Sequence, residues 1–136
     1  MRLYTVIVLL FLAALITLSG CTSFKTVEIV APEYDTTVSE LQPTLQWKAV
    51  PGKDVTYDLI IYKGDEINPV YYQEGLTEIS HSVKKELKPG TLYRWSVRSR
   101  IDGNESEWSK KETRIFTGVS YHQRSVFMRF LTPASP

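Results

Sequence analysis

The chain has 136 residues, 16 of them basic and 15 acidic, with a formal net charge of +1. This length suits one domain with a modest hydrophobic core. A net charge so close to zero argues against binding to nucleic acid or to an anionic membrane through the charge of the whole domain.

The first predicted element is an apolar run from Val6 to Leu18, which follows a short positive start at Arg2. The run is shorter than the roughly 20 residues that a membrane-spanning helix needs. Its positive start, apolar centre and small-residue end are typical of a secretory signal peptide. The sequence therefore predicts a signal peptide over residues 1–20.

The end of this run, Leu18-Ser19-Gly20-Cys21, resembles the bacterial lipobox. The resemblance implies a bacterial lipoprotein, in which a peptidase cuts before Cys21 and the new N-terminus carries diacylglycerol and a further acyl chain such as palmitate. Such chains are a strong membrane anchor. The alternative is an ordinary signal peptide or anchor with a chance cysteine.

Cys21 is the only cysteine, so its lipidation leaves no thiol for catalysis or for a disulfide. Thr22 follows it, and the resemblance to enterobacterial lipoproteins then favours the outer membrane, with the domain on the periplasmic face or at the cell surface. In a Gram-positive cell the site would be the outer face of the plasma membrane. Residues 21–26 form a short tether, so we expect the domain to lie close to the bilayer.

After the tether the apolar residues alternate with polar ones, and no segment keeps a helical period. This pattern predicts strands over residues 26–33, 45–49, 55–62, 69–73, 79–83 and 93–101. Turn-forming residues separate the later strands, at 51–54, 62–66, 87–90 and 102–106. Short strands with turn signals about every 8–12 residues indicate an all-β sandwich.

Two segments make the prediction more specific. Residues 43–63 resemble strands B and C of a fibronectin type III domain, with Trp47 as the core tryptophan. Residues 87–100 resemble the corner before strand F and strand F itself, with Tyr93 as the tyrosine of that corner and Leu87 beneath it.

Residues 106–109, Ser-Glu-Trp-Ser, resemble the segment after strand F in many bacterial members of this family. The resemblance implies a single fibronectin type III or immunoglobulin-like β-sandwich over residues 27–133, followed by a tail at 134–136. It implies no catalytic residues.

The C-terminal part holds one segment more than the family pattern needs. Residues 110–118 and residues 125–133 can each form the last strand. If the first does, residues 119–136 are a tail; if the second does, residues 110–124 are an insertion. We favour the second arrangement, because the chain ends just after it.

The surplus segment within residues 110–133 is rich in aromatic side chains. It either covers a sheet edge or docks a partner. The predicted docking residues are Phe116, Tyr121, Phe127 and Phe130.

The residues that could carry chemistry are sparse. His81 alternates with Ile79 and Val83, which suggests a place at the margin of the core, and His122 lies in the surplus segment. No histidine or cysteine has zinc-ligand spacing, the acidic residues are scattered among turns, and no glycine-rich phosphate loop is present. We expect no enzyme activity, no metal and no cofactor.

One predicted sheet face combines arginine with tyrosine. If the strands at 55–62 and 93–101 are neighbours, the following residues line the outer face beside Asp58: Arg94, Arg98, Arg100, Tyr62 and Ile60. The face is either a ladder of cross-strand pairs that keeps the sheet soluble or a site for a protein or an anionic glycan.

These expectations describe a membrane-anchored, non-catalytic protein-interaction module of the bacterial envelope, with an envelope protein as partner and no nucleic acid. Carbohydrate binding, to peptidoglycan or an exported polysaccharide, is an alternative, as is a structural spacer. Alternation puts Tyr71 and Tyr72 on opposite faces, so only one of them can join Tyr62 in a row of aromatic side chains. This weakens the carbohydrate alternative.

Overall fold

A computed structural model describes residues 24–135 of the chain. The predicted signal peptide and lipidation site, with Leu18, Ser19, Gly20 and Cys21, lie outside the described residues. Within them no helix is long and apolar enough to cross a bilayer. The described elements are β1 (Ile29–Ala31), β2 (Thr36–Thr37), β3 (Thr44–Trp47), β4 (Thr56–Lys63), β5 (Pro69–Leu76), β6 (Ser80–Ser82), β7 (Leu92–Ile101), β8 (Asn104–Glu105), β9 (Lys111–Phe116), β10 (Tyr121–Val126) and β11 (Met128–Leu131).

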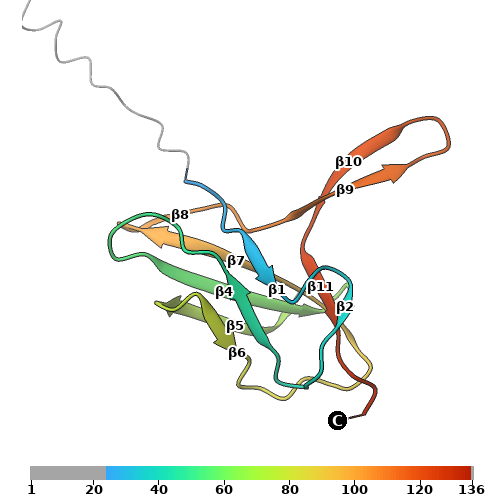
Figure 1. Cartoon of the computed structure of the whole chain (residues 1–136), viewed down its shortest axis with the longest axis horizontal. Coiled ribbons are helices and arrows are strands. Elements are labelled where there is room, and N and C mark those ends of the chain that lie inside the picture. The colour runs from blue at the N-terminus through green and yellow to red at the C-terminus, as the bar shows by residue number, and fades with distance from the viewer. Residues whose placement is uncertain (1–23, 136) are drawn as a thin grey trace, which may run out of the picture.

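The strands form two packed sheets and a separate hairpin (Figure 1). One sheet has the order β1-β3-β6, and the other has the order β2-β11-β7-β4-β5, with β8 also paired to β7. Their strands pair antiparallel, except that β2 and β11 are parallel. The prediction of an all-β sandwich is confirmed.

A single core lies between the sheets, built from the alternating apolar residues of the predicted strands. Trp47 and Trp95 are fully buried, and the ring of Trp47 lies 5.5 Å from that of Tyr57. The buried apolar side chains of the described residues all lie between Val27 and Phe130. The first residue of the strand predicted at 79–83 departs from the expected alternation, because Ile79 precedes β6 and is 47% exposed.

The side chain of Tyr93 stabilises the corner that precedes β7. Its side chain is buried, and its Oη accepts a hydrogen bond of 3.0 Å from the backbone N–H of Lys88. Leu87 packs in the same core, and Gly90 turns the chain with φ +54°, a value that favours glycine. These are the positions that the sequence resemblance assigned to the corner.

Replacing Tyr93 by Phe should lower the free energy of unfolding by about 1–2 kcal/mol, because it leaves the Lys88 N–H without its acceptor. Urea unfolding at neutral pH measures the change. Tyr72→Phe is the control, since the exposed Tyr72 hydroxyl donates only to the exposed Glu74. Equal losses in both variants would contradict a special role of the corner.

The last strand of the larger sheet lies along β7 in two pieces. In the first piece Glu105 pairs with Arg100, and Ser109 N–H donates to Val97 O at 2.9 Å. In the second piece Met128 pairs with Trp95. A single position of β7, Ser96, separates Val97 from Trp95, so residues 110–127 leave and rejoin one nearly continuous edge.

This register decides between the two arrangements of the C-terminal part. The last strand, β11, lies within the segment at 125–133, as we favoured, and the insertion holds residues 110–124 but extends further, because β10 ends at Val126. Phe130 is a correction: it was a predicted docking residue, but it is fully buried and stacks on Tyr93 at 5.8 Å. It lies on the inner face of β11, so it belongs to the core.

The insertion forms the β9–β10 hairpin, which projects from the sandwich (Figure 1). Its loop is the pair Gly118-Val119, closed by a 3.0 Å hydrogen bond from Thr117 N–H to Ser120 O. Gly118 has φ +86°, as the first position of a two-residue hairpin loop can require. Every residue of β9 and β10 is exposed or half-exposed.

Candidate functional site

The predicted arginine–tyrosine face is centred on a buried carboxylate. Asp58 is fully buried on β4, and its Oδ2 accepts hydrogen bonds from Arg98 Nε at 2.9 Å and from Arg100 Nε at 2.6 Å. The hydrogen bond to Asp58 raises the pKa of Arg100 above its usual value. Burial of a carboxylate requires such partners, so these two arginines serve the fold.

Further groups complete this network. Glu105 pairs with both Arg98 and Arg100, the latter at 2.9 Å. The ring of Trp108 covers Arg98, whose Cζ lies 4.7 Å from the ring centroid. Ser109, next to Trp108, binds the backbone of β7 by its Oγ, which accepts from Val97 N–H at 3.0 Å. Residues 106–109 therefore lie along β7 and form a lid, through Trp108, over Arg98.

The remaining members of the face lie at its other end. Arg94 donates to Gly64 O and Glu66 O and lies over the Tyr62 ring, with 5.3 Å from Cζ to the centroid. Phe127 stacks on Tyr62 at 6.1 Å. Ile60 is half-buried opposite Tyr72 on β5. The predicted residues do share one face, and most of their polar groups contact the chain itself, which favours the cross-strand ladder.

The two histidines lie in different environments. His81 is half-buried, and its Nε2 lies 2.7 Å from the hydroxyl of Tyr71. Burial, helped by the charge of Lys84, lowers the pKa of His81 below 6.5. His122 is exposed on the hairpin, with its Nε2 3.0 Å from Ser120 Oγ.

The folded chain should lose stability as the pH falls below 6.5, the ordinary pKa of histidine. The unfolded chain binds a proton at His81 more readily than the folded one, so acid favours unfolding. Melting temperatures measured between about pH 7.5 and 5 should therefore fall less steeply in His81→Gln than in the intact chain. His122→Gln is the control and should keep the intact slope; an unchanged slope in His81→Gln would contradict the assignment.

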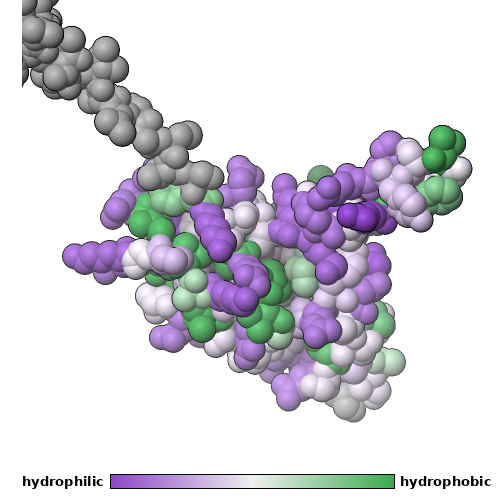
Figure 2. Space-filling model, turned by 45° about the horizontal axis from the view of Figure 1, so that its top comes forward, coloured by the Kyte–Doolittle hydropathy of each residue, from purple (hydrophilic) through white to green (hydrophobic). Residues whose placement is uncertain are grey.

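The end of the hairpin is the most exposed apolar feature among the described residues. Val119 is 93% exposed, Tyr121 72% and Phe116 58%, and Ile115 is exposed beside them. The rings of Phe116 and Tyr121 lie 5.0 Å apart. Figure 2 shows apolar colour at the far end of the projecting hairpin, behind a stem that is mostly hydrophilic. The predicted docking residues Phe116 and Tyr121 are thus presented to solvent together.

The hairpin stem is basic. Residues 110–126 contain Lys110, Lys111, Arg114 and Arg124 against one acidic residue, Glu112, a net charge of +3. Glu112 faces its own partner strand, where Gln123 Nε2 donates to it at 3.1 Å and Ser125 also bonds it. The stem therefore presents positive charge just below an apolar end.

Tyr34 marks the place where the hairpin leaves the sandwich. Its ring contacts both Lys111 and Arg129, at 5.6 Å from Lys111 Nζ and 5.0 Å from Arg129 Cζ. Arg129 is held in turn by Asp35, with both oxygens accepting at 2.9–3.0 Å, and this hydrogen bonding raises the pKa of Arg129. The base of the hairpin is thus tied to the segment between β1 and β2.

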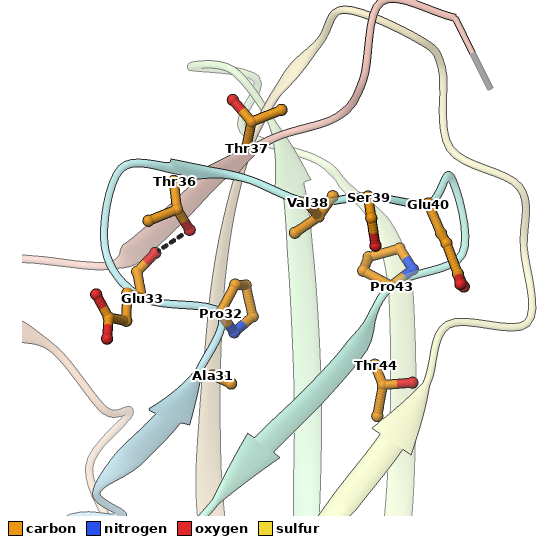
Figure 3. Close-up of a pocket in the computed structure, with 10 residues that line it drawn as sticks. All are labelled: Ala31, Pro32, Glu33, Thr36, Thr37, Val38, Ser39, Glu40, Pro43 and Thr44. Carbon is orange, nitrogen blue, oxygen red and sulfur yellow. Dashed lines mark hydrogen bonds between the residues drawn. The ribbon is translucent and has the colours of Figure 1, made fainter.

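The cavities offer little chemistry. A shallow one of about 380 Å³ lies along the segment that joins β1 to β3 and includes β2, lined among others by Pro32, Val38 and Pro43 (Figure 3). Its labelled polar groups include Thr36, which donates to Glu33 O at 2.8 Å. We find there neither a nucleophile beside a base nor a cluster of cations. In the described residues no group of three or more histidine, cysteine or acidic side chains could hold a metal ion.

Sequence reasoning missed the burial of Asp58 and the lid formed by Trp108. The signal was present in outline: Asp58 interrupts an apolar strand, and two arginines alternate on the strand predicted to lie beside it. The covering of Arg98 by Trp108 depends on the path of the chain after β8.

Comparison with known proteins adds no assignment to this geometry: no family model matches the chain, and no curated protein matches it.

Proposed function

We propose that the chain is a lipid-anchored, non-catalytic interaction module of the bacterial envelope, with one fibronectin type III-like domain. In this proposal Cys21 carries the lipid and the β9–β10 hairpin is the binding element. The envelope protein favoured from the sequence stays a prediction, as does the outer membrane as location.

One observation carries the proposal: the hairpin presents apolar side chains without burying them. An isolated two-stranded hairpin is at best marginally stable in water. Exposed apolar patches on an otherwise polar surface mark interaction sites. The exposed side chains of Phe116, Val119 and Tyr121 do not contribute to the core of the sandwich, so a binding role gives the best reason for their presence.

The carbohydrate alternative has weaker support. A planar row of exposed aromatic side chains is missing from the described part of the β4–β5 surface, because Tyr71 turns toward His81 and Phe127 covers Tyr62. Tyr72 alone is exposed there. A pure spacer gives no reason for an apolar hairpin end.

The test is in-membrane cross-linking of the lipidated full chain, compared with two variants. One lacks residues 111–127, and the other is Phe116→Ser/Val119→Ser/Tyr121→Ser. A cross-linked species that both variants lose supports the hairpin as the binding element. Equal cross-linking by all three proteins would contradict it and would leave the arginine–tyrosine face as the binding surface.

A further inference from the structure

We infer that the end of the β9–β10 hairpin inserts into the surface of an anionic phospholipid bilayer, the same one that the N-terminal lipid enters. The inference rests on the proposed function, because it takes the same hairpin as the binding element and names what it binds. Three features of the described residues carry it.

The first feature is that apolar side chains surround the hairpin end. Tyr121 pairs with Phe116, so these two side chains share one face of the ribbon, and Ile115 pairs with His122 on the other face. Val119 lies in the loop itself. A groove on a protein covers one face, whereas a bilayer surrounds whatever enters it. The all-round distribution therefore fits a membrane better than a protein socket.

The second feature is the separation of charge. Residues 110–126, the hairpin with Lys110 at its base, carry +3, while the rest of the described chain, with 11 basic and 14 acidic residues, carries −3. The near-zero total hides this separation. An anionic surface attracts the hairpin and repels the remainder, which orients the domain with the hairpin toward the lipid. The like charges of two hairpins oppose hairpin pairing between copies of the chain.

As part of this second feature, the charged side chains lie at the distance from the apolar end that separates lipid headgroups from the acyl boundary. Arg114 is two residues before Phe116, or about 7 Å along a strand. Arg124 is three residues after Tyr121. Aromatic and aliphatic side chains at the acyl boundary with Lys or Arg at the headgroups are the pattern of interfacial membrane binding.

The third feature is the placement of the hairpin relative to the start of the domain. In Figure 1 the segment that leads into β1 and the hairpin both lie on the upper side of the molecule, and the C-terminus lies on the lower side. Figure 2, turned by 45°, keeps both on the upper side. With the predicted short tether, a domain held at its N-terminal side has the hairpin directed toward that bilayer.

The probe is a vesicle of phosphatidylcholine with an equal part of phosphatidylglycerol, compared with pure phosphatidylcholine. The protein is the chain from residue 24 onward, which keeps every buried apolar side chain of the described structure and has no lipid. It should sediment with the anionic vesicles and much less with the neutral ones, and salt should weaken the binding. An intact chain that stays in solution with both vesicles would overturn the inference.

Two sets of variants separate insertion from simple charge attraction. Phe116→Ser/Val119→Ser/Tyr121→Ser should weaken binding to the anionic vesicles at least about tenfold. Ile67→Ser, which removes a side chain that is 89% exposed in the β4–β5 turn, should bind like the intact chain. Arg114→Glu/Arg124→Glu should weaken binding by a similar factor, whereas Lys84→Glu/Lys88→Glu should not. Loss on charge reversal but full binding by the serine variant would overturn insertion.

Insertion can also be observed directly, because the chain from residue 24 has no cysteine. Val119→Cys and Ile67→Cys each give one site for an environment-sensitive nitrobenzoxadiazole dye. Anionic vesicles should shift the emission of the dye at position 119 to the blue and leave that at position 67 unchanged. Equal emission at both sites would contradict the inference. Hairpin-dependent cross-links to a protein without vesicle binding would leave the proposed function standing and exclude the lipid partner.

Discussion

A chain that ends after Gly118 should fail to fold, whereas a chain that lacks only residues 111–127 should fold. The truncation removes β11, and with it the buried Phe130 and Met128. It also removes Thr132, whose Oγ1 donates to Lys88 O at 2.6 Å and accepts from Thr91 N–H at 2.9 Å. Loss of the Phe130 side chain alone should cost about 3–5 kcal/mol, which is a large part of the stability of a small domain.

The deletion of residues 111–127 is chosen from the way in which the two pieces of the last strand pair with β7. With residues 111–127 removed, Lys110 is the single residue between Ser109 and Met128, opposite the one β7 position that separates their partners. The deletion loses the stacking of Phe127 on Tyr62, so we expect a cost of about 1–2 kcal/mol. Circular dichroism and urea unfolding of both proteins are the measurements. A folded truncation, or an unfolded deletion, would contradict this description of the edge.

Replacing Asp58 by Ala should lower the free energy of unfolding by about 3–5 kcal/mol, because it leaves two arginines beside a buried site without their carboxylate. Arg98 is the more affected, since its side chain is only 16% exposed. Arg100 keeps Glu105 and, at 3.5 Å, Glu74. Urea unfolding measures the loss, and Asp65→Ala, at a fully exposed carboxylate 4.0 Å from Arg94, should change stability by less than about 0.5 kcal/mol.

A second substitution tests whether the cost is that of a stranded charge. Asp58→Ala/Arg98→Met removes both partners, and it should recover part of the loss seen in Asp58→Ala, because the guanidinium that has lost its buried carboxylate no longer lies under Trp108. The single variant Arg98→Met is measured beside them. If the losses of Asp58→Ala and Arg98→Met simply add up in the double variant, the two side chains act independently, and the buried ion pair would not explain the loss in Asp58→Ala.

The surplus C-terminal segment shows where sequence patterns stop being informative. Residues 110–118 and 125–133 have similar alternation, so each alone could form the last strand. The choice depends on which one finds the free edge of β7, and the inner face of that edge needs Phe130 against Tyr93. Phe130 and Phe116 each belong to an alternating segment of the sequence, yet Phe130 is buried and Phe116 is at the end of a hairpin. Local periodicity carries no information about that difference.

The arginine–tyrosine face is a second case in which the sequence pattern predicts where residues lie but not whether they are free to bind a partner. Alternation placed Arg94, Arg98 and Arg100 on one face beside Asp58, and the structure has them there. Whether such a face is free for a partner depends on what covers it. That is decided by residues 106–109, which return along β7 after a turn and lay Trp108 over Arg98.

By itself the sequence determined the sandwich, because a period of two and the turn residues are local properties, and the resemblance to a fibronectin type III domain pointed to Trp47 in the core and to Tyr93 at the corner. Only the tertiary structure decided that Phe130 is core, that Asp58 is buried with two arginines, and that residues 111–126 project as a basic hairpin with an apolar end. These properties depend on contacts between residues far apart in the chain, such as Arg98 with Asp58 and Met128 with Trp95. The net charge near zero likewise gave no sign of a positive hairpin on a negatively charged sandwich, since the total charge does not say where the charges lie in space.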